Sequence, residues 1–117
     1  MNIEDKIEDL SYITGIINGM ARSDNLDLYY TEHCLQRMKE REITSSDILF
    51  VLKTGIVTKY QGKAKHSNNT HKIHKYLIEG QHLTKNRDIG LVVLIEIDRL
   101  KMPAIKLQEI VTTMWRD

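Results

Sequence analysis

The sequence predicts an α+β domain in which helices come first and a curled antiparallel sheet of four strands follows. Before Gly55 the apolar residues recur at helical spacing, and after Gly55 the apolar segments are rich in β-branched and aromatic residues. A chain of 117 residues, 41% hydrophobic and 28% charged, has room for one core and is too short for two. We therefore expect a single domain over residues 1–117.

The first predicted helix runs from Ile3 to Met20. Apolar residues recur along it at helical spacing, and acidic residues gather in its first half, where the helix dipole favours them. We expect an extra N-terminal helix within residues 1–22, which packs over the sheet or provides the contact of a homo-oligomer or a partner protein. A polar, turn-prone segment from Ser23 to Asp27 follows it.

Two shorter helices are expected next. Thr31 is a suitable N-cap for a helix that carries His33, Arg37 and Arg41. Thr44 and Asp47, three residues apart, have the spacing of a capping box for the following helix. Gly55 stands where a left-handed C-cap is expected.

Four strands are predicted after Gly55, separated by segments that contain Gly, Asn, Asp or Pro; they are Ile56–Gln61, Ile73–Ile78, Leu91–Ile97 and Ile105–Trp115. Their succession favours an antiparallel meander. Leu91–Ile95 is apolar at every position, which predicts a central strand covered on one face and on part of the other.

The net charge of +1 hides a strong segregation of charge. No Asp or Glu occurs from Ile48 to Ile78, whereas lysines and histidines are frequent there. Many of them fall in a predicted basic hairpin, Tyr60–Lys75, which could bind a polyanion through phosphate contacts or be no more than a solvated loop. As nucleic-acid-binding residues the sequence offers Lys59, Lys63, Lys65 and Lys72.

His33, Arg37 and Arg41 recur every four residues and therefore share one stripe of their helix. Two guanidiniums match phosphate oxygens, and an imidazole beside them titrates near neutral pH. The stripe has the groups for holding a phosphodiester. An alternative stays open, because Arg and His also edge the buried face of amphipathic helices without any chemical role.

The histidines do not predict a metal site. His71 and His74 are three residues apart, so on a strand they point to opposite faces, and no Cys or carboxylate completes a set. An exposed basic hairpin is the simpler interpretation, and we expect no metal and no cofactor.

The remaining features concern the compartment. The lone Cys34 excludes an internal disulfide and is expected in the core. The first residues are acidic, unlike a secretory signal, and the longest apolar run, Leu91–Ile95, is far below the ~20 residues that cross a bilayer. We expect a cytoplasmic protein without a membrane segment.

Beyond these patterns, the chain resembles a known bacterial family. The resemblance rests on His33-x-x-x-Arg37-Met-x-x-Arg41-x-Ile43, on Ser46-Asp47-Ile48 before Gly55, and on a final strand ending Val111-Thr112-Thr113-Met114-Trp115. These motifs are similar to those of domain of unknown function 4258, over roughly residues 28–115. That family resembles RelE and MqsR toxins, which implies a RelE-like fold, metal-independent cleavage of messenger RNA and an antitoxin encoded nearby.

Metal-free RNA cleavage needs a base for the ribose 2′-hydroxyl, cationic donors for the phosphoryl oxygens and an acid for the leaving oxygen. His33 is the candidate base or acid. Arg37 and Arg41 are the candidate phosphate clamp, and Lys75 and Tyr76 the candidate supporting donors.

The last strand adds two candidates. Thr113 could orient a phosphate oxygen, and Trp115 could stack on a base. The alternatives are β-propensity for Thr113 and core closure for Trp115.

Two functions remain open. The first is a toxin-like protein that binds and cleaves RNA and so inhibits translation, with RNA or the ribosome and an antitoxin as partners. The second is a non-catalytic module of the same fold that binds nucleic acid or protein.

Overall fold

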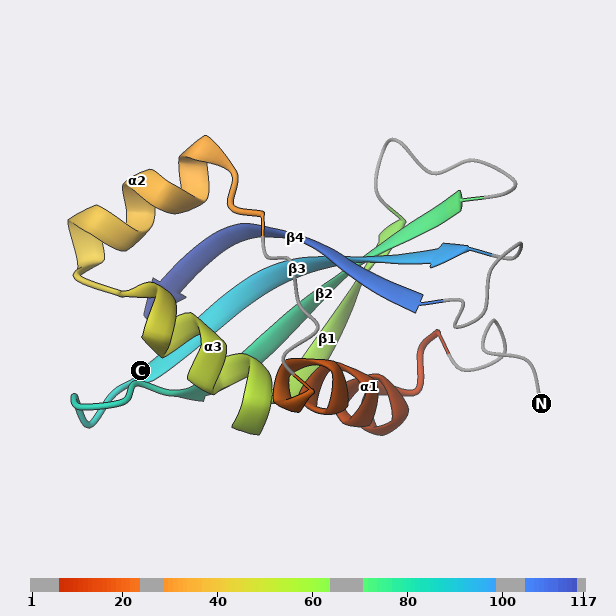
Figure 1. Ribbon diagram of the computed structural model, residues 1–117, viewed down its shortest axis with the longest axis horizontal. Coiled ribbons are helices and arrows are strands. Elements are labelled where there is room, and N and C mark those ends of the chain that lie inside the picture. Colours follow the sequence, from red (N-terminus) through yellow and green to blue (C-terminus); the bar gives the residue numbers. More distant parts are fainter. Residues whose placement is uncertain (1–6, 24–28, 64–70, 99–104, 116–117) are drawn as a thin grey trace.

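The computed structural model describes residues 7–23, 29–63, 71–98 and 105–115 (Figure 1). Within these ranges three helices precede an antiparallel sheet, as the α+β prediction requires. The elements are α1 (Leu10–Arg22), α2 (Glu32–Arg41), α3 (Ser45–Thr54), β1 (Ile56–Lys63), β2 (His71–Gln81), β3 (Asp88–Asp98) and β4 (Ile105–Trp115).

The sheet is an antiparallel set of β1, β2 and β3, and β3 also pairs with β4, giving the order β1-β2-β3-β4. The strands twist, and α1 and α3 lie across one face while α2 lies beside β4 (Figure 1). β2 and β3 pair without interruption from His71↔Asp98 to Gln81↔Asp88, whereas the two outer pairings contain register shifts. The continuous pair β2–β3 forms the centre of the sheet, while α1 contacts β1, α3 contacts β2 and α2 contacts β4.

β2 and β3 are longer than the sequence predicts. The expected bounds, Ile73–Ile78 and Leu91–Ile97, cover only the apolar centres of these strands. Their polar ends are held in the sheet by backbone pairing, which does not depend on an apolar side chain. β3 is central, as expected, with Leu91, Val92 and Val93 all buried.

α1 begins later than the sequence predicts. The expected start at Ile3 lies outside the described residues. The prediction that the helix runs through Ile7 and Asp9 is wrong. Ile7 lies in a turn, and Asp9 has extended backbone and caps α1 by accepting a hydrogen bond from the Tyr12 N–H (3.1 Å). An N-cap residue is not itself helical, so the helix cannot run through it.

α1 contributes to the core of the chain. Ile13 and Ile17 are fully buried in the main hydrophobic cluster. The Thr14 hydroxyl accepts from the Val57 N–H (2.9 Å), and the Asn18 amide donates to the Leu52 carbonyl (2.7 Å) at the end of α3. Of the two roles expected for this helix, packing within the chain is observed, and a contact with a homo-oligomer or a partner protein stays a prediction.

The caps of α2 and α3 follow the sequence prediction. The Thr31 side chain accepts from the Cys34 N–H, and Thr44 and Asp47 form a complete capping box. α2 ends at Glu42, a non-glycine residue in the left-handed region (φ 56°, ψ 42°). Thus α2 is terminated by an unusual backbone conformation that the sequence did not indicate.

Gly55 is not the left-handed cap that the sequence predicts. Its backbone is extended (φ −77°, ψ 176°). A Cβ at this position would lie 2.5 Å from the Val51 carbonyl oxygen and 2.7 Å from that of Glu79. Glycine is required here because the end of α3 approaches β2 too closely for any side chain.

Among the described residues, none of the helices is both long enough and apolar enough to cross a lipid bilayer.

Candidate nucleic-acid interface

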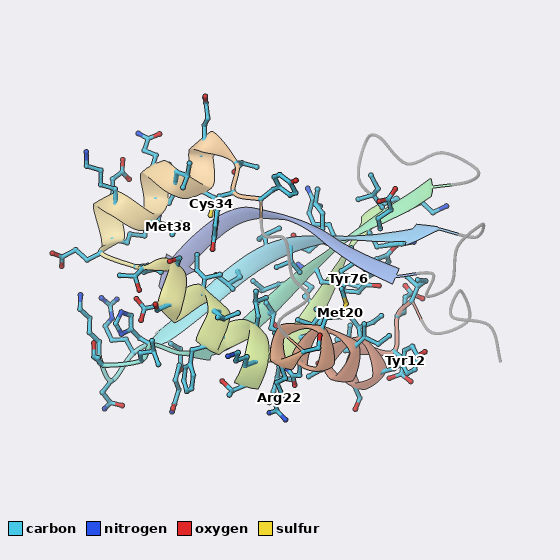
Figure 2. The ribbon with its side chains drawn as sticks, in the orientation of Figure 1. Tyr12, Met20, Arg22, Cys34, Met38 and Tyr76 are labelled. Carbon is cyan, nitrogen blue, oxygen red and sulfur yellow. The ribbon has the colours of Figure 1, made fainter. Side chains whose placement is uncertain are left out.

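The His33, Arg37 and Arg41 stripe lies along one edge of the buried face of α2. Cys34 is completely buried and faces the sheet (Figure 2), and Met38 packs against the core one turn later. His33 is exposed, and Arg37 and Arg41 are partly exposed. The imidazole and guanidinium groups of the stripe are therefore at or near the surface, while the helix that carries them is packed against the core.

Arg37 already has a carboxylate partner on its own helix. Its Nη1 lies 2.7 Å from Glu40 Oε2, and the two side chains are 36% and 45% exposed. The hydrogen bond from Arg37 holds the pKa of Glu40 below its ordinary value. An exposed pair of this kind is screened by solvent and contributes little to stability, so a phosphate can replace Glu40 easily.

α2 packs against β4, the strand that carries the two C-terminal candidates. On this strand Thr113 pairs with Leu91, and Trp115 pairs with Ile89. The structure therefore brings the helix of the stripe and the end of β4 together as neighbouring elements. The side-chain positions of Thr113 and Trp115 lie outside the described residues.

Lys75 and Tyr76 do not join the stripe. Tyr76 is completely buried, and its hydroxyl donates to the Ile7 carbonyl (2.8 Å). Burial, with smaller effects from Tyr60 and Glu8, raises the pKa of Tyr76. Lys75, the residue before Tyr76 on the strand, points to the opposite face of the sheet, and β3 separates β2 from β4. The group of supporting donors expected from the sequence is not assembled around α2.

β1, which carries two of the candidate lysines, is the other edge strand of the sheet. Lys59 and Lys63 are exposed on β1. Lys65 and the side chain of Lys72 lie outside the described residues. Three strand spacings of ~4.8 Å separate β1 from β4, or roughly 14 Å. One ligand could contact both the hairpin and the stripe only if it extends across the sheet.

His74 is not part of an exposed hairpin surface, contrary to the sequence interpretation. It is 3% exposed, and its Nδ1 is hydrogen-bonded to the Tyr60 hydroxyl (2.8 Å). Burial raises the pKa of Tyr60, and the charge of Glu8 adds to the effect. The alternation of His74, Tyr76 and Ile78 was the available signal, since these residues share one face of β2. No group of potential metal ligands occurs among the described residues.

A buried Asp47–His82 pair is the feature that sequence reasoning missed. His82 Nε2 lies 3.1 Å from Asp47 Oδ2, and both side chains are about 5% exposed or less. Burial raises the pKa of Asp47, but the hydrogen bonds from Thr44 and the Leu83 N–H, together with the neighbouring His82 ring, outweigh it, so the pKa is lower than usual. Asp47 was recognised as a cap, but no local pattern connects it with His82, 35 residues later.

This pair forms the floor of a small surface pocket of about 400 Å³. The pocket lies between the α2–α3 corner and the β2–β3 turn, and its lining is Glu42, Thr44, Asp47, His82, Leu83, Thr84 and Lys85. Lys85 Nζ bridges its rim at 3.4 Å from Glu42 Oε2.

Comparison with known proteins decides the family. The family model described as Domain of unknown function (DUF4258) matches residues 30–115. The chain belongs to the DUF4258 family. The resemblance drawn from the motifs of α2 and β4 is thereby confirmed at the level of this family. No curated protein and no solved structure matches the chain.

The DUF4258 match includes α2, α3 and the whole sheet, and it leaves out α1. Its first helix carries the stripe and its last strand carries Thr113 and Trp115, so the two ends of the matched region are the elements that meet in space. α1 nevertheless supplies Ile13 and Ile17 to the core. The family region and the folding unit of this chain therefore have different boundaries.

Proposed function

We propose that this DUF4258 protein is a toxin-like RNA-binding protein of RelE-like fold that cleaves RNA without a metal and so inhibits translation in the cytoplasm. The observation that supports this proposal is the α2 stripe beside β4. An exposed imidazole and two partly exposed guanidiniums follow one line of the surface, next to the strand that carries Thr113 and Trp115.

The proposed reaction assigns one task to each group. His33 takes the proton of a ribose 2′-hydroxyl, and the 2′-oxygen attacks the adjacent phosphorus. Arg37 and Arg41 donate hydrogen bonds to the phosphoryl oxygens, where negative charge develops. The bond from phosphorus to the 5′-oxygen breaks, and that oxygen takes a proton from solvent. The products are a 2′,3′-cyclic phosphate and a 5′-hydroxyl.

The remaining candidates take secondary places. Thr113 orients a phosphate oxygen and Trp115 stacks on a base at the end of β4. Lys59 and Lys63, at the opposite edge of the sheet, contact RNA phosphates at nucleotides away from the cleavage site. Tyr76 has no part in the proposed reaction, because its buried hydroxyl is used to hold the backbone at Ile7.

A second function is favoured by one specific contact. Arg37 is bonded to Glu40, which is how an arginine at the edge of a structural helix face would look. In that case the chain is a non-catalytic module, and the exposed lysines of β1 bind nucleic acid while α2 binds an acidic partner such as an antitoxin.

One experiment distinguishes the two functions. The purified protein is incubated with end-labelled single-stranded RNA and EDTA, and the products are analysed for cyclic phosphate ends. Wild-type protein is expected to cleave and His33→Ala to be inactive while still binding RNA. Lys39→Ala, which removes an exposed charge from the other side of α2, should cleave as wild type does. Binding without cleavage by the wild-type protein would support the module instead.

A further inference from the structure

Asp47 and His82 connect two segments that are distant in the sequence. Asp47 lies in the first turn of α3, and His82 lies in the turn between β2 and β3. Besides its contact with His82, Asp47 Oδ2 accepts from both the backbone N–H and the hydroxyl of Thr44, each at 2.8 Å. One buried carboxylate oxygen therefore holds the N-cap of α3 to the sheet.

The other ring nitrogen of His82 fixes its own turn. Nδ1 accepts from the backbone N–H groups of Thr84 (3.1 Å) and Lys85 (3.0 Å). Since Nδ1 is an acceptor, the proton of the neutral ring is on Nε2, toward Asp47. Nδ1 is thus held by its own turn, and Nε2 is buried 3.1 Å from Asp47 Oδ2 in a close polar contact that does not have the geometry of a hydrogen bond. Through this contact the ring links the turn to α3.

The link extends to the end of α2 because the connection is short. Only Glu42 and Ile43 lie between the last residue of α2 and the cap Thr44. The Glu42 N–H donates to the Lys39 carbonyl, and the Ile43 N–H donates to that of Met38 (2.9 Å). With Ile43 buried in the core, this corner has little freedom that is independent of Thr44.

We infer that His82 is a positioning residue: through Asp47 it fixes the corner between α2 and α3, and so holds the His33, Arg37 and Arg41 stripe in place over β4. The role of the stripe in RNA chemistry rests on the proposed function, whereas the link between His82 and α2 is a property of the fold. Each of these two claims is tested by its own measurement, so one can be contradicted while the other holds.

Two variants of His82 separate its two contacts. His82→Asn keeps a short acceptor for the turn N–H groups but cannot reach Asp47. His82→Gln keeps an N–H donor at the reach of Asp47 and lacks the acceptor at the Nδ1 position. Lys85→Ala is the matched control, because it removes the exposed Glu42–Lys85 contact from the same turn and leaves the buried pair intact.

The first measurement is amide hydrogen exchange at Glu42 and Ile43, with Ile17 of α1 as the internal reference. His82→Asn should accelerate exchange at both corner amides by about tenfold or more relative to Ile17. His82→Gln should restore much of the protection, and Lys85→Ala should stay close to wild type. If His82→Asn does not fold, His82→Gln is compared with Lys85→Ala in the same way. Unchanged corner exchange in the folded His82 variants overturns the inference.

The second measurement is RNA cleavage below the melting temperature of every variant. His82→Asn should lower kcat by up to about a hundredfold through a displacement of ~1 Å. KM should change little, because the attraction between cationic side chains and phosphates acts at long range, and His82→Gln should recover part of kcat. A wild-type protein that does not cleave RNA would contradict the proposed function, while the exchange result would still decide the role of His82.

Discussion

Asp47 is the residue whose surroundings depart most from what its neighbours in the sequence suggest. Its carboxylate is buried, accepts from Thr44 and lies against His82, and these contacts hold its pKa below the ordinary value. Asp47→Ala removes the two hydrogen bonds that Thr44 donates and leaves the His82 Nε2–H without its buried neighbour. We therefore expect a loss of about 2–3 kcal/mol at neutral pH in urea unfolding. The exposed Asp88→Ala serves as control and should change the free energy of unfolding by less than ~0.5 kcal/mol.

The pH dependence of this effect has a defined sign. Because the pKa of Asp47 is lowered on folding, its charged form stabilises the native state above the unfolded value of ~3.9. That contribution is lost as the pH falls through the lower pKa of the folded protein. The difference between wild type and Asp47→Ala should therefore shrink below pH ~4. An equal difference at neutral and strongly acidic pH would contradict this explanation.

Cys34 is a buried group whose pKa is shifted by burial alone. Burial raises the pKa of its thiol to about 11, and the side chain is completely buried under α2. As the thiolate is the reactive form, native protein should resist iodoacetamide at pH 8 and react readily after unfolding. With one cysteine in the chain, the labelling is unambiguous. Equal rates in native and unfolded protein would place this thiol at the surface.

At the scale of elements, local signals predicted local structure. The caps Thr31 and Thr44 were recognised because a capping residue and its target are three residues apart. The function of Gly55 was not, because the atoms that exclude a side chain there include the Glu79 carbonyl on another element. The Asp47–His82 pair was missed for the same reason. Contacts between elements depend on packing, which no short segment encodes.

The basic hairpin and the α2 stripe are separate elements with separate expected effects. Replacing Lys59 and Lys63 of β1 by glutamine removes exposed charges without touching the core. Folding should be unchanged, and the slope of log K against log salt for RNA binding should decrease by about 0.7 for each phosphate that a lysine no longer neutralises. Lys53→Gln on α3 is the control for the loss of one charge and is compared with each of the two β1 substitutions made singly. An unchanged slope would show that the lysines of β1 are only solvated.

For the whole molecule, the sequence predicted the α+β class, the helix order and the central strand. It also predicted α1 as an extra helix outside the family domain, whereas Ile13 and Ile17 of this helix are part of the core. Hydrophobic periodicity identifies an apolar face, but it does not show whether that face packs within the chain or on a partner. The same limit applies to the site. His33, Arg37 and Arg41 could be grouped because they share one helix, whereas the separation of Lys75 and Tyr76 from them followed only from the sheet order.

The packing of α1 gives a test of the folding unit. Ile17 is fully buried, whereas the adjacent Ile16 is only partly so. Ile17→Ala should lower the free energy of unfolding by roughly 2–5 kcal/mol, and Ile16→Ala by clearly less. Urea unfolding measures both. Equal, small losses would mean that α1 is an appendage to the DUF4258 region.

The central claim is that the stripe of α2 performs chemistry on RNA. Arg37→Lys keeps the charge and removes the planar pair of donors, and the partly exposed position should tolerate this change without loss of melting temperature. Single-turnover RNA cleavage by the folded variant is the measurement that tests the claim most directly. We expect the cleavage rate to fall by an amount equivalent to ~3 kcal/mol, the typical value for a missing transition-state donor. A less stable Arg37→Lys protein that cleaves at the wild-type rate per folded molecule would contradict the claim and assign Arg37 to packing.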